Sequence, residues 1–114
     1  MTLGNNFHQK LEKETGISMD EDSIDLPKEQ TATDSLADYV KFLFEEGHLS
    51  KDELPIESGW TRYLLNTEPV HTEGDEMTRP KEVLPGVFLE RNYNREGIIR
   101  KMRFLHRLVE QESK

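Results

Sequence analysis

The C-terminal part of the chain carries the pattern that most strongly constrains the fold. Between residues 94 and 111, apolar residues recur every three or four positions, the spacing of one face of an α-helix. Asn92 or Asn94 is a suitable N-cap for such a helix. The sequence therefore predicts a long amphipathic helix whose buried stripe comprises Ile98, Met102, Leu105 and Val109 and is widened by Ile99, Phe104 and Leu108.

A second helix is predicted over residues 34–46, where apolar residues again follow the helical period. Thr33 or Asp34 provides a cap at its start, and Gly47 follows its end. Phe42 lies off the main stripe, so either the apolar face is broad or Phe42 is exposed to a partner; the broad face is favoured. The stripe comprises Leu36, Tyr39, Val40, Leu43 and Phe44.

Two further helices are expected, at residues 56–66 and, more weakly, at residues 3–15. In the first, Ile56, Trp60, Tyr63 and Leu64 fall at positions i, i+4, i+7 and i+8. The second is short, and an isolated helix of this length is marginal in water. Between residues 46 and 56, either a single helical turn forms at residues 50–54 or Pro55 begins the next helix.

The segments between these helices read as irregular structure. Residues 17–33 are rich in acidic and hydroxyl side chains and are expected to form an acidic, partly disordered arm. Residues 67–80 contain two prolines and a glycine and are expected to form a loop. Residues 83–90 hold a Pro-Gly pair between short apolar runs and form either a small hairpin or an extended segment. The extended segment is favoured, because an isolated hairpin is barely stable.

These elements together predict a mainly α fold of three to four helices with a minor extended or hairpin segment. Residues 1–33 are expected to form an N-terminal helix and flexible arm, and residues 34–114 a single helical domain. The chain has 114 residues, no cysteine and no apolar run approaching the roughly 20 residues of a membrane span. With no signal-peptide pattern at residues 1–6, the expected compartment is the cytoplasm.

Charge is distributed unevenly along the chain. Residues 1–76 hold 18 acidic and 6 basic side chains, whereas residues 77–114 hold 5 acidic and 9 basic ones. The net charge of −8 argues against general nucleic-acid binding, because attraction to phosphates dominates the affinity of such proteins. The basic C-terminal part is expected to complement the acidic part, within one molecule or across a homodimer, or to bind an acidic partner.

No motif in the sequence points to catalysis, a cofactor or a metal. The seven glycines form no phosphate-binding loop, and no serine lies in a nucleophile motif. The four histidines are too far apart in the sequence to form a helical ligand pair. His71, Glu73, Asp75 and Glu76 are the densest group of ligand-type residues, but they lie in a loop that no sequence feature makes rigid. We therefore expect no enzyme activity, no metal site, no cofactor and no small-molecule substrate.

The predicted C-terminal helix carries arginines opposite its apolar stripe, and these are the main candidate binding residues. Arginine suits carboxylate and phosphate recognition, and aromatic residues often dominate protein interfaces. We therefore expect an accessory or regulatory protein that binds another protein through helix faces. Two different roles also fit the sequence: a nucleic-acid-related role, by weak arginine contact or by acidic mimicry within residues 12–53, and a non-catalytic subunit of an enzyme complex. The candidate binding residues are Arg95, Arg100, Arg103, Arg107, Phe42, Trp60 and Tyr63.

Overall fold

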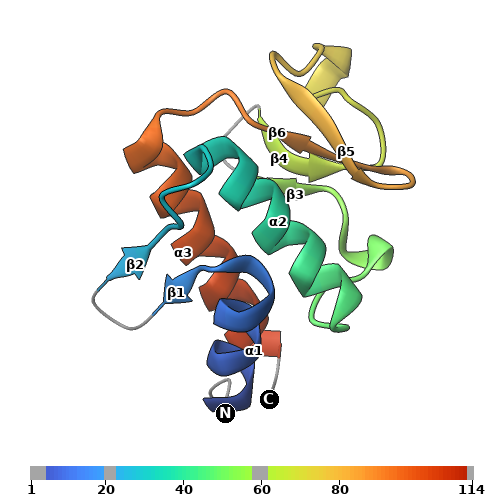
Figure 1. The fold of residues 1–114 in the computed structure, drawn as a ribbon. Coiled ribbons are helices and arrows are strands. Elements are labelled where there is room, and N and C mark those ends of the chain that lie inside the picture. Colours follow the sequence, from blue (N-terminus) through green and yellow to red (C-terminus); the bar gives the residue numbers. More distant parts are fainter. Residues whose placement is uncertain (1–4, 20–22, 58–61, 113–114) are drawn as a thin grey trace.

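The chain folds as an α+β structure, so the predicted mainly α fold is wrong. The computed structural model describes residues 5–19, 23–57 and 62–112. These residues form three α-helices with one two-stranded and one four-stranded antiparallel sheet (Figure 1). In chain order the elements are α1 (Asn5–Thr15), β1 (Ser18–Met19), β2 (Ile24–Asp25), α2 (Ala32–Glu45), the 3-10 turn η1 (Lys51–Glu53), β3 (Ile56–Glu57), β4 (Tyr63–Asn66), the 3-10 turn η2 (Thr72–Gly74), β5 (Pro80–Leu84), β6 (Val87–Glu90) and α3 (Arg95–Glu112).

Three of the four predicted helices are confirmed. α1, α2 and α3 match the predicted segments with ends shifted by no more than two residues. α2 begins earlier than predicted because Thr31 is its cap, with Oγ1 accepting a hydrogen bond from the Asp34 amide at 3.2 Å. Asn94 caps α3 as predicted, and its Oδ1 accepts from the Gly97 amide at 2.8 Å. Local pattern is therefore sufficient to locate these helices.

The predicted helix at residues 56–66 is wrong, because this segment contributes strands β3 and β4. The two strands pair antiparallel, with Ile56 opposite Leu65. Leu64 and Leu65 are adjacent in sequence and both fully buried. Successive side chains of a strand point to opposite faces, so a strand that is covered on both faces buries both leucines. Trp60, which completed the apparent helical pattern, lies outside the described residues.

Residues 83–90 belong to the β5–β6 hairpin, so the favoured extended segment is wrong and the small hairpin is correct. Leu84 pairs with Val87 across the Pro85-Gly86 turn. Gly86 has a φ of +78°, as required at the third position of a type II turn that has proline at its second. The hairpin is stable here because β6 also pairs with β4, which gives the sheet order β3-β4-β6-β5.

The end of α2 and the connection that follows it agree with the sequence pattern in part. Phe42 is only 3% exposed, which confirms that the apolar face of α2 is broad. Gly47 adopts a φ of +80° after the helix, as predicted. A single 3-10 turn then forms at η1, and residues 56 and 57 form β3. Pro55 therefore does not begin a helix.

The described part of the acidic arm is built into the core, so the predicted partly disordered arm is wrong there. β1 and β2 pair with Ser18 opposite Asp25 and Met19 opposite Ile24. Apolar and polar side chains alternate along both strands, and the apolar ones face the core. The buried side chains are those of Ile17, Met19, Ile24 and Leu26. The division of the chain at residue 33 stays a prediction, although both sides of it share this core.

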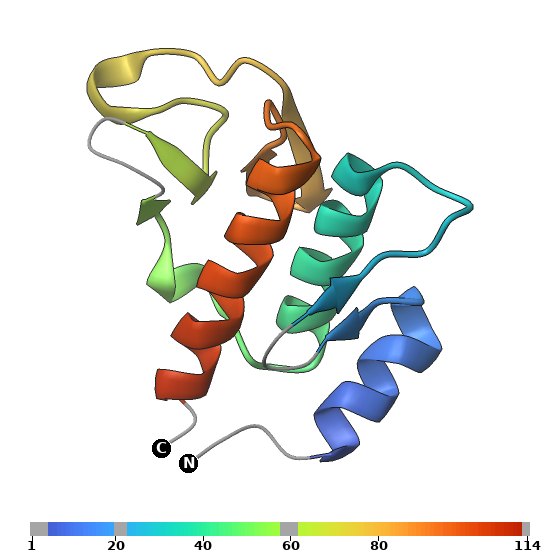
Figure 2. The same ribbon diagram turned by 90° about the vertical axis from the view of Figure 1, so that its left-hand side faces the viewer.

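α2 is the helix around which the other elements pack. It contacts α1, α3 and β5, and its large fully buried side chains are those of Leu36, Tyr39, Val40 and Leu43. In Figure 1 the four-stranded sheet lies above the helices and the β1–β2 pair to their left, while Figure 2 turns α3 toward the viewer. The predicted stripe of α3 (Ile98, Met102, Leu105 and Val109) is at most 1% exposed. The opposite side of α3 therefore faces solvent.

Candidate functional site

The solvent side of α3 presents three arginines around one exposed aromatic side chain. Arg100 and Arg107 are exposed and Arg103 is half-buried. Phe104, at 40% exposure, is the exposed large hydrophobic side chain among the described residues. At about 100° per residue, these four side chains fall within one third of the helix circumference. We call Arg100, Arg103, Phe104 and Arg107 the basic face of α3.

The exposure of Phe104 differs from the sequence prediction, which placed this residue at the margin of the buried stripe. The helical period itself contains the signal, because Phe104 follows Arg100 by four positions and precedes Arg107 by three. It therefore shares the arginine side of the helix. The mistake was to group Phe104 with its neighbour Leu105, which is fully buried. A residue directly beside a core position on a helix is turned about 100° away from it.

Ion pairing leaves two arginines of the basic face, Arg100 and Arg107, largely available. Arg100 lies 3.6 Å from Glu96, measured from Nη2 to Oε2, and both side chains are more than three-quarters exposed. Exposed pairs of this kind contribute about 0.3–0.5 kcal/mol and break easily when a competing carboxylate approaches. Within the described residues, neither Arg100 nor Arg107 forms an ion pair with the acidic segment.

The remaining predicted binding residues lie elsewhere. Arg95 is exposed in the first turn of α3, but helical geometry turns it about 140° away from Arg100. Phe42 is buried on α2 with its ring edge against Phe7, at 5.5 Å between centroids. Tyr63 is half-buried in β4, and Trp60 lies outside the described residues. The structure thus brings together the arginines at 100, 103 and 107, but not the aromatic residues proposed with them.

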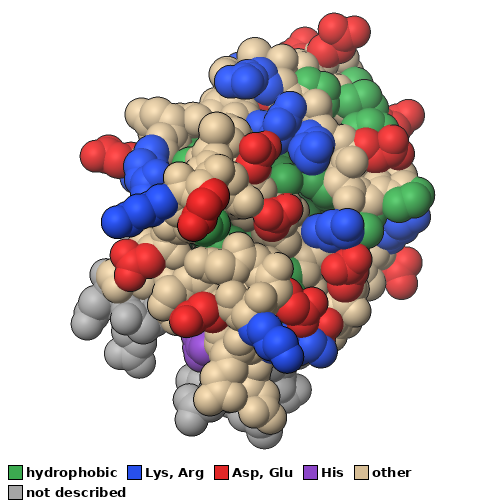
Figure 3. Space-filling model, in the orientation of Figure 1, with side chains coloured by type: hydrophobic (Ala, Val, Ile, Leu, Met, Phe, Trp, Pro, Cys, Tyr) green, Lys and Arg blue, Asp and Glu red, His purple; other side chains and the backbone are tan. Residues whose placement is uncertain are grey.

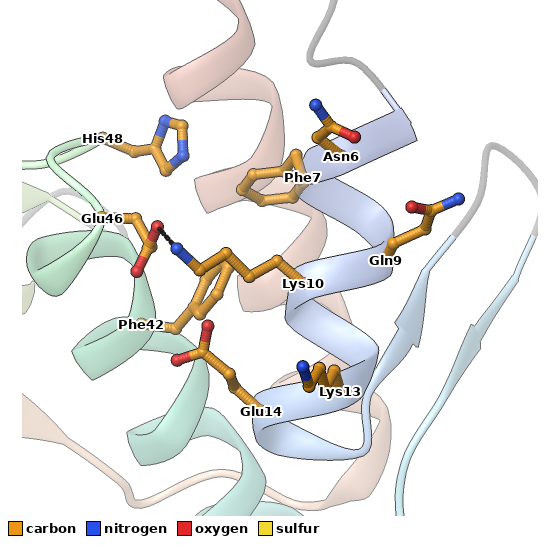
Figure 4. Close-up of a pocket in the computed structure, with 9 residues that line it drawn as sticks. All are labelled: Asn6, Phe7, Gln9, Lys10, Lys13, Glu14, Phe42, Glu46 and His48. Carbon is orange, nitrogen blue, oxygen red and sulfur yellow. Dashed lines mark ion pairs between the residues drawn. The ribbon is translucent and has the colours of Figure 1, made fainter.

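A groove of about 780 Å³ separates α1 from the C-terminal end of α2 (Figure 4). Phe7 and Phe42 lie at its base, and the Nζ of Lys10 lies 2.6 Å from Oε1 of Glu46 across it. The hydrogen bond to Glu46 raises the pKa of Lys10. The remaining polar side chains along the groove are of both charges, and its lining comprises Asn6, Phe7, Gln9, Lys10, Lys13, Glu14, Phe42, Glu46 and His48. Such mixed charge selects no ligand class.

His71 and Glu90 form a buried polar pair beneath the loop that follows β4. Nδ1 of His71 accepts from the Tyr63 amide at 2.9 Å, so the ring hydrogen is on Nε2, which donates to Glu90 Oε1 at 3.0 Å. The Glu90 carboxylate also accepts from four backbone amides, those of Thr78, Arg79, Arg91 and Asn92. Both partners are at most 3% exposed. The loop is therefore held to the sheet by a contact between residues distant in the sequence, which no local sequence feature indicated.

The role of the His71–Glu90 pair is structural. Although burial raises the pKa of a carboxyl group, the amides and the His71 imidazole outweigh this effect and hold the pKa of Glu90 below its ordinary value. Both nitrogens of His71 have partners, so neither is open to a proton transfer or a metal. Two small cavities beside the pair, of about 260 and 220 Å³, are both bordered by Arg62. Within the described ranges, no cluster of three or more His, Asp or Glu is placed to hold a metal ion.

Comparison with protein-family models, with curated proteins and with solved structures found no match to this chain. Among the described residues, no helix combines the length and the apolar character that crossing a bilayer requires. On the side shown in Figure 3, acidic and basic side chains are interspersed, and hydrophobic ones emerge over the β5–β6 hairpin. Among the surfaces described above, the basic face of α3 is the one whose side chains best distinguish one class of ligand from another.

Proposed function

We propose that this protein is an accessory or regulatory protein that binds an acidic segment of another protein through the basic face of α3. The observation that carries the proposal is the exposed Phe104 between Arg100 and Arg107. Arginine and aromatic residues are enriched at protein interfaces and among the residues that dominate binding energy. An aromatic ring gives such a contact apolar area, and the flanking guanidinium groups select carboxylates.

The charge of the rest of the molecule favours a partner with a local acidic segment. Residues 77–114 carry a net positive charge, whereas the whole chain carries −8. An acidic partner that approaches the acidic part of the molecule is therefore repelled. A nucleic acid is a weaker candidate, because three arginines neutralise at most about three phosphates and the remaining charge repels the duplex. A second copy of this chain, which supplies its own acidic part, is the competing partner that the self-association measurement below distinguishes.

The proposed role needs no catalysis, since the contacts named above are sufficient for recognition. A non-catalytic subunit of an enzyme complex is one form that such an accessory protein takes. We also propose a cytoplasmic location, in keeping with the lack of cysteine in the sequence. Cell fractionation followed by immunoblotting tests this location directly, and recovery in a secreted fraction would contradict it.

The test is affinity capture from native lysate at physiological salt, followed by cross-linking mass spectrometry to locate the contact. The test variant combines Arg100→Glu, Phe104→Ala and Arg107→Glu. The matched control is Arg95→Glu, because Arg95 is exposed on the same helix but on a different side. We expect the wild type and the control to capture the same protein and the test variant to lose it. The cross-links should join α3 to an Asp- and Glu-rich segment.

Three results would contradict the proposal. Capture by the test variant as strong as by the wild type would place the interface elsewhere. Sub-micromolar binding of a fluorescent DNA or RNA duplex at physiological salt would instead favour the nucleic-acid role. Concentration-dependent self-association abolished by the same variant, with no other protein captured, would favour the homodimer. Unchanged thermal unfolding of the test variant serves as the control for folding, because its three side chains lie outside the core.

A further inference from the structure

Three of the four histidines in the chain gather around Phe7 on α1. The Phe7 ring lies 5.0 Å from the His48 ring, 5.4 Å from the His8 ring and 5.7 Å from the His106 ring, between centroids. His8 and His106 are themselves 5.6 Å apart. The three histidines come from α1, from the segment after α2 and from α3. The cluster therefore lies where α1 meets the other two helices.

The polar groups around His106 can compensate the positive charge of one protonated histidine ring, but not of two. Its Nε2 lies 3.2 Å from Oε1 of Glu110, one turn away on α3, and its Nδ1 lies 3.5 Å from the hydroxyl of Tyr39 on α2. Burial raises the pKa of Tyr39, so this hydroxyl stays neutral. Glu110 is thus the carboxylate that faces His106 within the described residues, and a positive charge on His106 would also face the neighbouring ring of His8.

His8 and His48 have still less compensation. Nδ1 of His8 is buried without a hydrogen-bond partner in the described part of the chain. Near His48 the closest carboxylate is that of Glu46, which is already bound to Lys10 of α1. Farther along the groove, Lys13 and Glu14 of α1 contribute one charge of each sign. Protonation of all three rings therefore adds three positive charges around one phenylalanine, against one unshared carboxylate.

α1 is also the helix with the weakest independent support. It has 11 residues, and a helix of this length does not persist alone in water. Phe7 and Leu11 are its side chains in the core cluster. Its ion pair with Glu46 joins side chains that are 53% and 24% exposed, and such pairs are worth little. The packing of Phe7 among the histidines is therefore a main attachment of α1 to the rest of the molecule.

We propose that this histidine cluster is a pH-sensitive latch, and that protonation of His8, His48 and His106 releases α1 and opens its groove against α2. Two imidazolium rings 5.6 Å apart repel each other in a half-buried setting, and moving α1 outward relieves that repulsion. α2, α3 and the sheet keep their own shared core during this release, because their buried side chains pack directly on one another.

The titration behaviour of two of the histidines agrees with this geometry. Burial lowers the pKa of His106 and of His48 below the ordinary value of 6.5, while Glu110 and Glu46 act in the opposite direction. A histidine with a lowered pKa binds its proton less readily when the latch is closed than when it is open. The closed state is therefore fully favoured above about pH 6.5 and loses that advantage as the pH falls through the lowered values.

The test is hydrogen exchange of the full chain at about pH 7.5 and about pH 5.5, with each amide corrected for its intrinsic rate. We expect the protection factors of the α1 amides to fall about tenfold at the lower pH, because the open state binds protons more readily than the closed state. Amides of the α2 interior and of β6 should keep their protection. The variant His8→Gln with His106→Gln should show a much smaller pH response in α1, because only His48 of the cluster then remains to bind a proton.

The control is Lys10→Met, which removes the ion pair to Glu46 but leaves the histidines in place. It should lower α1 protection at both pH values and keep the pH response that His8 and His106 supply, although Glu46 is then free to compensate a charge on His48. Equal α1 protection in the wild type at both pH values would overturn the latch, as would loss of protection in α1, α2 and β6 together. Should the double variant not fold, the single variant His48→Gln decides, because a full pH response in it and unshifted histidine titrations by NMR would contradict the proposal.

Discussion

His71 and Glu90 are 19 residues apart in the sequence and meet inside the molecule, with Nε2 of the imidazole 3.0 Å from Oε1 of the carboxylate. His71 belongs to the loop between β4 and β5, and Glu90 ends β6. The pair ties this loop to the sheet, and the backbone amides of Thr78 and Arg79 donate hydrogen bonds to the same carboxylate. A single buried acid thus organises a segment that has little regular structure of its own.

Replacing Glu90 with glutamine should destabilise the fold and change its response to acid. The side-chain amide of glutamine would point a donor at backbone amides that also donate, at a cost of about 1–3 kcal/mol. Because the pKa of Glu90 is lowered on folding, its stabilising effect is present above the ordinary value of 4.5 and is lost as the pH falls through the lowered value. Urea unfolding of the wild type and of Glu90→Gln at neutral and acidic pH measures both effects.

The stability difference between these two proteins should therefore shrink at acidic pH. Glu45→Gln is the matched control, since Glu45 is exposed at the end of α2 and should change stability little at either pH. A Glu90→Gln protein as stable as the wild type at neutral pH would show that the buried carboxylate does not organise the loop.

Adjacent residues of α3 should respond very differently to truncation. Leu105 is fully buried, so Leu105→Ala should lower the free energy of unfolding by about 2–5 kcal/mol. Phe104 is exposed, and Phe104→Ala should change it by less than about 0.5 kcal/mol. Chemical denaturation of both variants checks the contrast. Comparable losses in the two variants would mean that Phe104 packs in the core.

The segment with β1 and β2 should be protected from exchange and sensitive to substitution on its inner side. Ile17 is fully buried, so Ile17→Ala should cost about 2–5 kcal/mol. Asp25 faces outward, and Asp25→Ser should be nearly neutral. Denaturation and exchange of the Met19 and Ile24 amides provide the measurement. Free exchange at both residues would restore the idea of a mobile arm.

The turn of the β5–β6 hairpin should depend on glycine. Gly86 has a φ of +78°, and an added Cβ would lie 3.3 Å from Nζ of Lys51. Gly86→Ala should therefore cost about 1–2 kcal/mol, the strain of an L-residue in the left-handed region. Gly86→Asn should cost less, because asparagine tolerates this region better. Thermal unfolding of both variants tests the order, and an alanine variant as stable as the asparagine one would contradict it.

The three helices could be predicted from the sequence and the four-stranded sheet could not, for one physical reason. The stripe from Ile98 to Val109 repeats over about three turns, and its geometry is fixed by local spacing alone. The strands are two to five residues long, too short to show a period, and they are stabilised by partners far away in the sequence. In residues 63–66, two adjacent buried leucines satisfy a helical and a strand pattern equally well.

The same distinction between local spacing and tertiary contacts applies to the candidate surfaces. The arginines at positions 100, 103 and 107 share a helix face, so the sequence places them together. The exposed Phe104 follows from the same period once its phase is compared with that of Arg100. The pairing of His71 with Glu90, and the approach of His8 to His106, join elements whose relative positions only the tertiary fold determines. No local pattern contains that information.

In β1 and β2, apolar and polar residues alternate, so the side chains that pack in the core and the side chains that carry charge occupy different positions. Within the described residues, the core uses the inward side chains of Ile17, Met19, Ile24 and Leu26 and leaves Ser18, Ser23 and Asp25 exposed. The acidic side chain of Asp25 is therefore not needed for the core. Over evolutionary time the surface charge here is free to drift or to adapt to a new partner while the backbone stays the same. Divergent homologues should thus keep the apolar spacing of this segment long after its acidic character has gone.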